Sequence, residues 1–177
     1  MTASLVRRAK LEDAEAIGEV HYRAWQEAYR AHLAPELQSR FDLTARANQW
    51  RVNMQTGARE VLVAVQGEDV VGFCSVAPCR DADAVDGAGE VTALYVDPSS
   101  WRGGHGKALL SAGRDHARRM GWRVLSLWVL SANAAARAFY AAQGFLPDGT
   151  DKTEGDPPLH EVRYRMSLEA EPVLARE

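Results

Sequence analysis

The sequence has little cysteine and no long apolar run, and both absences narrow the class of protein. Its 177 residues include two cysteines, Cys74 and Cys79, which are too few for a disulfide framework, and no Cys/His spacing fits a four-ligand zinc site. No stretch approaches the roughly 18 apolar residues that cross a bilayer. The N-terminus also lacks the apolar segment of a signal peptide. These absences predict a cytoplasmic protein without a metal or a membrane partner.

An overall excess of positive charge is absent as well. The chain carries 21 basic and 24 acidic side chains and a formal net charge of −3, which argues against a nucleic-acid partner. The distribution is uneven, because six basic and two acidic residues lie between Asp97 and Arg123. Such a local excess is typical either of a solvated helix face or of a site for a phosphorylated ligand.

The hydrophobic periodicity predicts one domain over residues 1–168 and a frayed tail over 169–177. Strands are expected over 5–9, 60–66, 70–77, 90–96, 124–130, from 145, and over 160–168; helices are expected from 13, from Pro35 to about 55, over 106–120 and over 133–143. Residues 67–69 are expected to form a three-residue hairpin loop. This order of elements predicts a mixed sheet with helices on both faces.

A glycine-rich loop, Trp101 to Lys107, joins an expected strand to an expected helix. Its glycines let the backbone approach an anion closely, and the helix N-terminus offers unpaired N–H groups and a positive dipole end. The loop is not a Walker A motif, because Ala108 stands where that motif needs Ser or Thr. It also lacks the three-glycine pattern of dinucleotide-binding folds. It is therefore a candidate diphosphate site of another kind.

A second segment, Asn133 to Phe145, supports an assignment to a family. It contains an Asn, then an aromatic-Tyr pair at residues 139 and 140, then Gly-Phe. With Gly104 and Gly106 in the pattern Gln/Arg-x-x-Gly-x-Gly/Ala, the sequence resembles the Gcn5-related N-acetyltransferase superfamily over residues 4–168, most densely over 90–145. Trp101 departs from the pattern, which has Gln or Arg there. The resemblance implies an α/β acetyltransferase fold, with a mixed, mostly antiparallel sheet whose central strands splay near 94–96 and 127–130.

The resemblance also implies that acetyl-CoA is the co-substrate, and it assigns residues to it. The strand backbone at Leu94, Tyr95 and Val96 would pair with the pantetheine arm, and the side chain of Asn133 would touch the pantetheine chain. The phenol of Tyr140 would lie beside the sulfur. The diphosphate would be held by the N–H groups of the loop residues Arg102, Gly103, Gly104, His105, Gly106 and Lys107.

The chemistry of acetyl transfer predicts further roles. An amine that attacks a thioester must be neutral, and the departing thiolate needs a proton, which Tyr140 is suited to supply. Glu90 lies 16 residues before Gly106, the last loop glycine. In some branches of the superfamily a glutamate at that spacing acts as the base, so Glu90 is a candidate base. Its alternative role is a solvated strand end. Trp25 and Tyr29 lie four residues apart on one helix face, which either borders the acceptor pocket or belongs to the core.

Two other groups of residues have open interpretations. The acidic residues Asp81, Asp83 and Asp86 either attract a cationic amine or form a solvated loop. Trp128 is expected to pack beneath the cofactor strand.

The predicted function is transfer of an acetyl group from acetyl-CoA to a primary amine of a small molecule or peptide, by direct attack in a ternary complex. A non-catalytic acyl-CoA-binding regulatory module and a transferase for another acyl-CoA are the alternatives. The segments expected to shape the acceptor pocket, the first two helices and the loop between the last two strands, contain no motif that identifies the acceptor. The sequence does not decide whether the protein forms a homodimer.

Overall fold

A computed structural model describes residues 5–29, 42–155 and 158–169. The strands are β1 (Leu5–Arg8), β2 (Glu60–Gln66), β3 (Asp69–Pro78), β4 (Ala88–Val96), β5 (Val124–Leu130), β6 (Leu146–Glu154) and β7 (Leu159–Ser167). The α-helices are α1 (Ala14–Tyr29), α3 (Leu43–Thr56), α4 (His105–Arg119) and α5 (Ala134–Ala142), and the short 3-10 helices are η1 (Leu11–Asp13) and η2 (Pro98–Ser100).

The strands form one sheet in the order β1-β2-β3-β4-β5-β7-β6. Strands β4 and β5 pair in parallel, and the other neighbours pair antiparallel. The parallel pair follows from the connection, because α4 returns the chain to the edge at which β4 began. The predicted mixed, mostly antiparallel sheet is confirmed.

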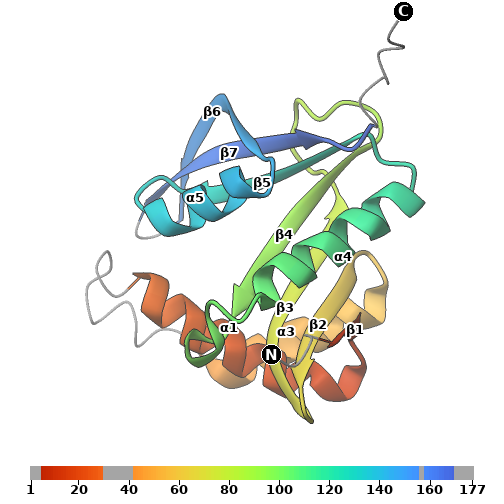
Figure 1. Cartoon of the computed structure of the whole chain (residues 1–177), viewed down its shortest axis with the longest axis vertical. Coiled ribbons are helices and arrows are strands. Elements are labelled where there is room, and N and C mark those ends of the chain that lie inside the picture. The colour runs from red at the N-terminus through yellow and green to blue at the C-terminus, as the bar shows by residue number, and fades with distance from the viewer. Residues whose placement is uncertain (1–4, 30–41, 156–157, 170–177) are drawn as a thin grey trace, which may run out of the picture.

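Helices cover both faces of this sheet (Figure 1). A separate apolar cluster lies beneath the helices on each face. Helices α1 and α3 pack on one face, where Ile17, Trp50 and Phe73 belong to one buried cluster. Helix α4 packs on the other face against β2, β3 and β4, and the cluster there continues to Tyr140 of α5 and to Phe145. The two clusters explain why β2 and β3 are buried at nearly every position, since successive side chains enter opposite apolar layers.

The central parallel pair is short, which opens the sheet from within. Residues Ala88–Val91 of β4 pair with Val124–Leu127 of β5, and the pairing stops there, although both strands continue. The C-terminal half of β4 keeps β3 on one side and has no strand partner on the other within the described ranges. The predicted splay is therefore confirmed, and it leaves backbone groups of β4 available to a ligand.

Two expectations about local structure change. The β2–β3 turn has two residues, because Gln66 pairs directly with Asp69 and Gly67 takes a positive φ of 65°; a glycine at the first central position suits such a tight turn. Helix α3 begins at Leu43, after Asp42 accepts a hydrogen bond from Ala45 N. The start expected near Pro35, and most of the expected tail, lie outside the described residues.

Candidate active site

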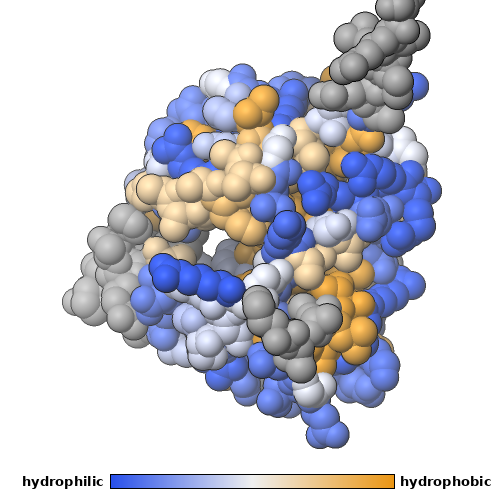
Figure 2. All heavy atoms as spheres, in the orientation of Figure 1, coloured by the Kyte–Doolittle hydropathy of each residue, from blue (hydrophilic) through white to orange (hydrophobic). Residues whose placement is uncertain are grey.

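The opening between β4 and β5 continues into two adjoining cavities of about 370 and 530 Å³. Figure 2 shows this face of the molecule hollowed between α5 and the segment that precedes α4. Leu94 and Val96 of β4, with Asn133 and Tyr140, line both cavities. The larger cavity extends to the glycine-rich loop, and the smaller one extends along β4 to Glu90. The sequence therefore brings most of its predicted cofactor residues to one cleft.

The glycine-rich loop forms the outer end of the larger cavity. Gly104 is the N-cap of α4 with φ +83°, and Arg102 takes φ +64°, a left-handed conformation that non-glycine residues rarely adopt. These turns direct the loop around the helix N-terminus, where backbone N–H groups lack helical acceptors. Arg102, Gly104, His105, Gly106 and Lys107 all line the cavity.

Gly103 is the one predicted loop residue that has a different setting. It is exposed and does not line the cavity, and a β-carbon there would approach His105 Nε2 to 2.8 Å. The glycine therefore makes room for the buried His105 ring, which is 7% exposed. Packing inside the loop explains this glycine without any ligand.

Trp101 closes the loop back on β4. Its Nε1 donates a hydrogen bond of 2.8 Å to the carbonyl of Val96, although the residue is 50% exposed. The carbonyl at the end of the open edge of β4 is thereby satisfied inside the protein. This contact gives a structural reason for an aromatic residue at the position where the family pattern has Gln or Arg.

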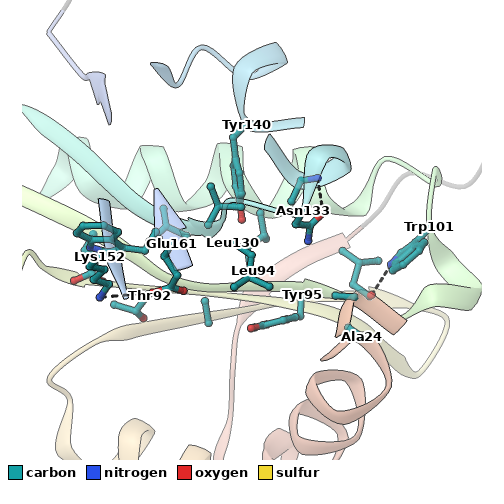
Figure 3. A pocket seen from close by; sticks show the side chains of 18 of the residues that line it. Ala24, Thr92, Leu94, Tyr95, Trp101, Leu130, Asn133, Tyr140, Lys152 and Glu161 are labelled. Atoms are coloured by element: carbon teal, nitrogen blue, oxygen red, sulfur yellow. Dashed lines mark hydrogen bonds and ion pairs between the residues drawn. The ribbon is translucent and has the colours of Figure 1, made fainter. Parts of the chain in front are cut away.

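Asn133 and Tyr140 enter the cleft from α5 and its N-terminus (Figure 3). Asn133 caps the helix, because its Oδ1 accepts a 3.0 Å hydrogen bond from Ala136 N. Its amide nitrogen is left to serve the cleft. Tyr140 is 9% exposed, and burial raises the pKa of its phenol above the ordinary value. The phenol therefore holds its proton at neutral pH.

Glu90 lies at the inner end of the smaller cavity and is 6% exposed. Arg80 engages both carboxylate oxygens: Nη2 donates to Oε1 at 3.3 Å and Nε donates to Oε2 at 3.4 Å. The hydrogen bond to Glu90 in turn raises the pKa of Arg80. Glu90 is thus a buried ion-pair partner, which differs from the solvated strand end that the sequence left as its alternative.

The two expectations about the acceptor helix have different outcomes. The residues of α1 that line the cleft are Ala24 and Ala28, whereas Trp25 is half-buried and is not part of either lining. The backbone of Tyr29 ends α1, and its side chain lies outside the described part of the chain. The helix predicted to border the acceptor pocket does border the cleft, through smaller side chains.

The acidic loop is bound into the fold by a buried arginine. Arg163 of β7 is 2% exposed and donates hydrogen bonds to Asp81, Asp83 and Asp148 at 2.6–3.0 Å. The pKa of Asp83 is lowered to about 2, chiefly by its hydrogen bonds with Arg163. Asp81 and Asp83 are therefore ion-paired with Arg163, which leaves less of their charge to attract an amine. The solvated-loop interpretation holds in part, because the Asp83 side chain is 61% exposed and Asp86 is exposed.

The lining of the cleft includes three large side chains that the sequence did not indicate as cleft residues. Trp128, Lys152 and Glu161 come from β5, β6 and β7, and all line the smaller cavity. The Trp128 ring faces Lys152 Nζ at 4.4 Å from its centroid, and its Nε1 donates to Asp81 Oδ1 at 3.0 Å. Trp128 thus forms a wall of the cleft instead of packing beneath a strand. No sequence signal marked these residues as cleft residues, because only the pairing of β6, β7 and β5 brings them together.

Comparisons with known proteins match this sequence and this fold. The model of the acetyltransferase (GNAT) family matches residues 16–145. The chain belongs to this family. It is 30% identical over 139 residues to "Uncharacterized N-acetyltransferase YuaI" of Bacillus subtilis, with 77% of each chain covered. It is 34% identical over 120 residues to a mycothiol acetyltransferase of Sanguibacter keddieii, covering 67% of this chain and 36% of that enzyme.

Solved structures of the family have the same architecture. The PaiA N-acetyltransferase of Thermoplasma acidophilum, solved with coenzyme A, has a TM-score of 0.74 at 20% identity and covers 94% of this chain and 99% of its own. YncA of Salmonella typhimurium, solved with acetyl-CoA, has a TM-score of 0.72 at 25% identity, with 97% and 98% covered. The chain is accordingly an acetyltransferase with the GNAT fold.

The described residues contain neither a candidate metal-ion site nor a membrane-spanning helix. No group of three or more His, Cys, Asp or Glu side chains in the described ranges is arranged to hold a metal ion. Within the same part of the chain, no helix has the length and apolarity needed to cross a membrane.

Proposed function

We propose that this GNAT protein transfers the acetyl group of acetyl-CoA to a primary amine by direct attack in a ternary complex. The observation that carries the proposal is the open edge of β4. It runs from Val96, next to the glycine-rich loop, back to Thr92, where the paired segment that contains Glu90 begins, and Tyr140 lines the same cleft. An extended thiol arm on this edge would have its diphosphate at a helix N-terminus and its reacting end beside a phenol.

The residues present fit acetyl-CoA, as Gly106 illustrates. A β-carbon at this position would lie 3.5 Å from the Phe139 ring and 3.7 Å from Val96, so the fold itself has room for it. The missing methyl group widens the cavity next to the first turn of α4. Arg102 and Lys107 are exposed and line the same cavity, which suits the negative charge of a diphosphate.

The cleft also contains residues suited to the chemistry. Acetyl-CoA supplies a thioester whose thiolate leaves as the amide bond forms. Tyr140, protonated at neutral pH because burial raises its pKa, donates its proton to that thiolate. Glu90 has both oxygens engaged by Arg80, so we propose that this pair fixes the shape and charge at the acceptor end.

The first test is a thermal-shift titration with acetyl-CoA. A ligand at about 100 times its Kd stabilises a protein by roughly 2.7 kcal/mol, so the wild type is expected to melt at a clearly higher temperature with acetyl-CoA. The Gly106→Ala variant is the control, because its methyl group narrows the cavity while the fold accommodates it. No shift in the wild type at millimolar acetyl-CoA would end the proposal.

The second test separates the enzyme from its alternatives. Thiol release is measured with acetyl-CoA and a panel of amines that includes amino acids, polyamines, aminoglycosides and peptide N-termini. Turnover with an amine supports the proposal. A thermal shift without turnover for any amine would favour a regulatory acyl-CoA-binding module. Stronger binding and turnover with succinyl-CoA would favour a different acyl donor.

A further inference from the structure

We propose that Glu161 of β7 is the general base that takes the proton from the acceptor amine. This inference rests on the proposed function, because it concerns the acceptor end of the same cleft. Glu161 was not among the residues that the sequence indicated. It reaches the cleft because β7 pairs with β5 on one side and with β6 on the other.

The place of Glu161 along the cleft supports this role. Glu161 and Tyr140 line the same cavity, together with Leu94 and Leu130. In Figure 3, Asn133 and Trp101 lie on one side of Tyr140, and Glu161 and Lys152 lie on the other. Asn133 and Trp101 line the larger cavity, which extends to the glycine-rich loop. Glu161 therefore lies beyond the phenol, on the side from which an amine would approach the thioester.

The carboxylate of Glu161 has few interactions within the described part of the chain and is partly open to solvent. Among the described residues, Glu161 has one ion pair, with Lys152 Nζ at 3.7 Å, and its side chain is 27% exposed. The carboxylate of Glu90 is 8% exposed and is bound through both oxygens to Arg80. A base must reach the proton it removes and leave its acceptor lone pairs open to it. Glu161 meets this requirement and Glu90 does not.

The surroundings of Glu161 also favour proton uptake. Partial burial, the carboxylate of Glu154 on β6 and that of Glu90 on β4 raise its pKa, while Lys152 on β6 acts in the opposite direction; the net shift is upward from the ordinary 4.5. Tyr95 of β4 is also within electrostatic range. A carboxylate with a raised pKa is a stronger base toward an ammonium ion than one with an ordinary pKa.

The step moves two protons away from the nitrogen of the acceptor. The acceptor enters as an ammonium ion and gives one proton to the carboxylate of Glu161, which leaves a neutral amine. The nitrogen forms a C–N bond to the thioester carbonyl carbon, and the C–S bond breaks. The thiolate takes the proton of Tyr140, the second nitrogen proton restores the phenol, and Glu161 returns its proton to solvent. The products are an amide and a free thiol.

The test compares Glu161→Gln with Glu154→Gln. Both variants remove a carboxylate that contacts Lys152, since Glu154 Oε2 lies 3.1 Å from the same Nζ. With the best amine of the panel, we expect Glu161→Gln to lower kcat/KM by about 10² to 10³ at neutral pH. We expect Glu154→Gln to stay within about threefold of wild type. The deficit of Glu161→Gln shrinks as pH approaches the pKa of the amine, which is about 10 for an alkylamine and about 8 for an α-amino group, because a free amine needs no base.

A second readout does not depend on turnover. The raised pKa means that the folded state holds the Glu161 proton more tightly than the unfolded state, so the charged carboxylate lowers stability above pH 4.5. The melting temperature of Glu161→Gln relative to wild type is therefore expected to rise between about pH 4 and pH 7. Glu154→Gln is the control in this series as well.

The outcomes distinguish this inference from the proposed function. A wild type that turns over an amine while Glu161→Gln matches it across the pH range would overturn the base role alone. Loss of the acetyl-CoA thermal shift in Glu161→Gln would also overturn it, because it would show that the variant disturbs the donor site. A wild type without acetyl-CoA binding or turnover would instead remove the proposed function and the base role together.

Discussion

Tyr140 illustrates how one side chain serves both the core and the cleft. Its ring packs edge-on against Phe139 and Phe145, with centroids 5.3 and 6.0 Å away. Its hydroxyl has no hydrogen-bond partner among the described residues, and the residue lines both cavities. A buried hydroxyl normally finds a partner, so this one is suited to meet a ligand.

Substituting Tyr140 with Phe tests that role. We expect kcat to fall by about 10²-fold or more, because the thiolate loses its proton donor. The melting temperature is expected to stay near that of wild type, since the ring packing remains and no hydrogen bond to the described residues is lost. Steady-state kinetics across pH and a thermal melt measure both effects. An unchanged kcat would contradict the assignment of Tyr140 as the acid.

Gly104 and Gly106 form a matched pair of residues. Gly104 has φ +83° and open space where a β-carbon would lie, whereas Gly106 has ordinary backbone angles and faces the cavity. We expect Gly104→Ala to cost about 1 kcal/mol of stability through backbone strain. We expect Gly106→Ala to keep or slightly raise stability and to weaken acetyl-CoA binding. Melts with and without acetyl-CoA separate the two effects, and a destabilised Gly106→Ala would contradict this prediction.

At the scale of elements, helix α5 depends on Asn133 for its first turn. The Oδ1 cap to Ala136 N orients the helix that carries Tyr140 into the cleft. Loop residue Ser131 is held to the same helix, because Arg137 Nη1 donates to its carbonyl at 3.0 Å. The position of the phenol thus follows from local contacts at the start of α5.

Two substitutions separate capping from ligand binding at Asn133. Asn133→Ala removes the cap and is expected to cost about 1 kcal/mol of stability. Asn133→Asp keeps an oxygen cap and is expected to retain stability, but it replaces the amide donor with a negative charge and weakens acetyl-CoA binding. Chemical denaturation and the acetyl-CoA thermal shift measure the two effects. Equal acetyl-CoA binding by wild type and Asn133→Asp would show that Asn133 has only a capping role.

Elements with a strong local pattern were predictable from the sequence. Strand β5 is a nearly continuous apolar run, interrupted by Ser126: Leu125 and Leu127 belong to the core, and Trp128 and Leu130 line the cleft. Helix α4 shows an apolar stripe, and Gly121 follows its C-terminus. The turn between β2 and β3 was misjudged by one residue, because Asp69 joins the ladder instead of the loop. A polar residue next to a turn fits either state, and the pairing register decides between them.

At the scale of the whole molecule, the α1–α3 face contains a buried histidine. His21 is 8% exposed, and its Nδ1 accepts a 3.2 Å hydrogen bond from Trp50 Nε1. Its ring lies 4.5 Å from that of Tyr95 on β4. Burial lowers the pKa of His21 from 6.5 to about 3, so the folded protein holds a neutral imidazole.

This histidine predicts how the global stability depends on pH. The unfolded state takes up a proton below pH 6.5 and the folded state does so near pH 3, so stability is lost as pH falls through this window. The loss is on the order of 3 kcal/mol by about pH 4. His21→Leu lowers the overall stability but is expected to flatten this slope. The remaining slope comes from His116, whose pKa is also lowered, from Glu161 with the opposite sign, and near pH 4 from carboxyls with a lowered pKa such as Asp13 and Asp148. Unfolding free energies measured from pH 7 to pH 4 provide the test; an unchanged slope would contradict it.

The sequence by itself indicated the residues that we propose for the donor end of the cleft, whereas only the tertiary structure brought together those that we propose for the acceptor end. The glycine-rich loop, Asn133 and Tyr140 lie in two short segments whose residue types are required by local backbone geometry, helix capping and a strand-to-helix turn. Glu161, Lys152 and Trp128 come from three different strands. Their contacts join residues that are distant in sequence: Trp128, for example, donates a hydrogen bond to Asp81, which also accepts one from Arg163. Such contacts depend on strand order and register, which follow from the packing of the whole sheet. No local sequence pattern predicts them for this reason.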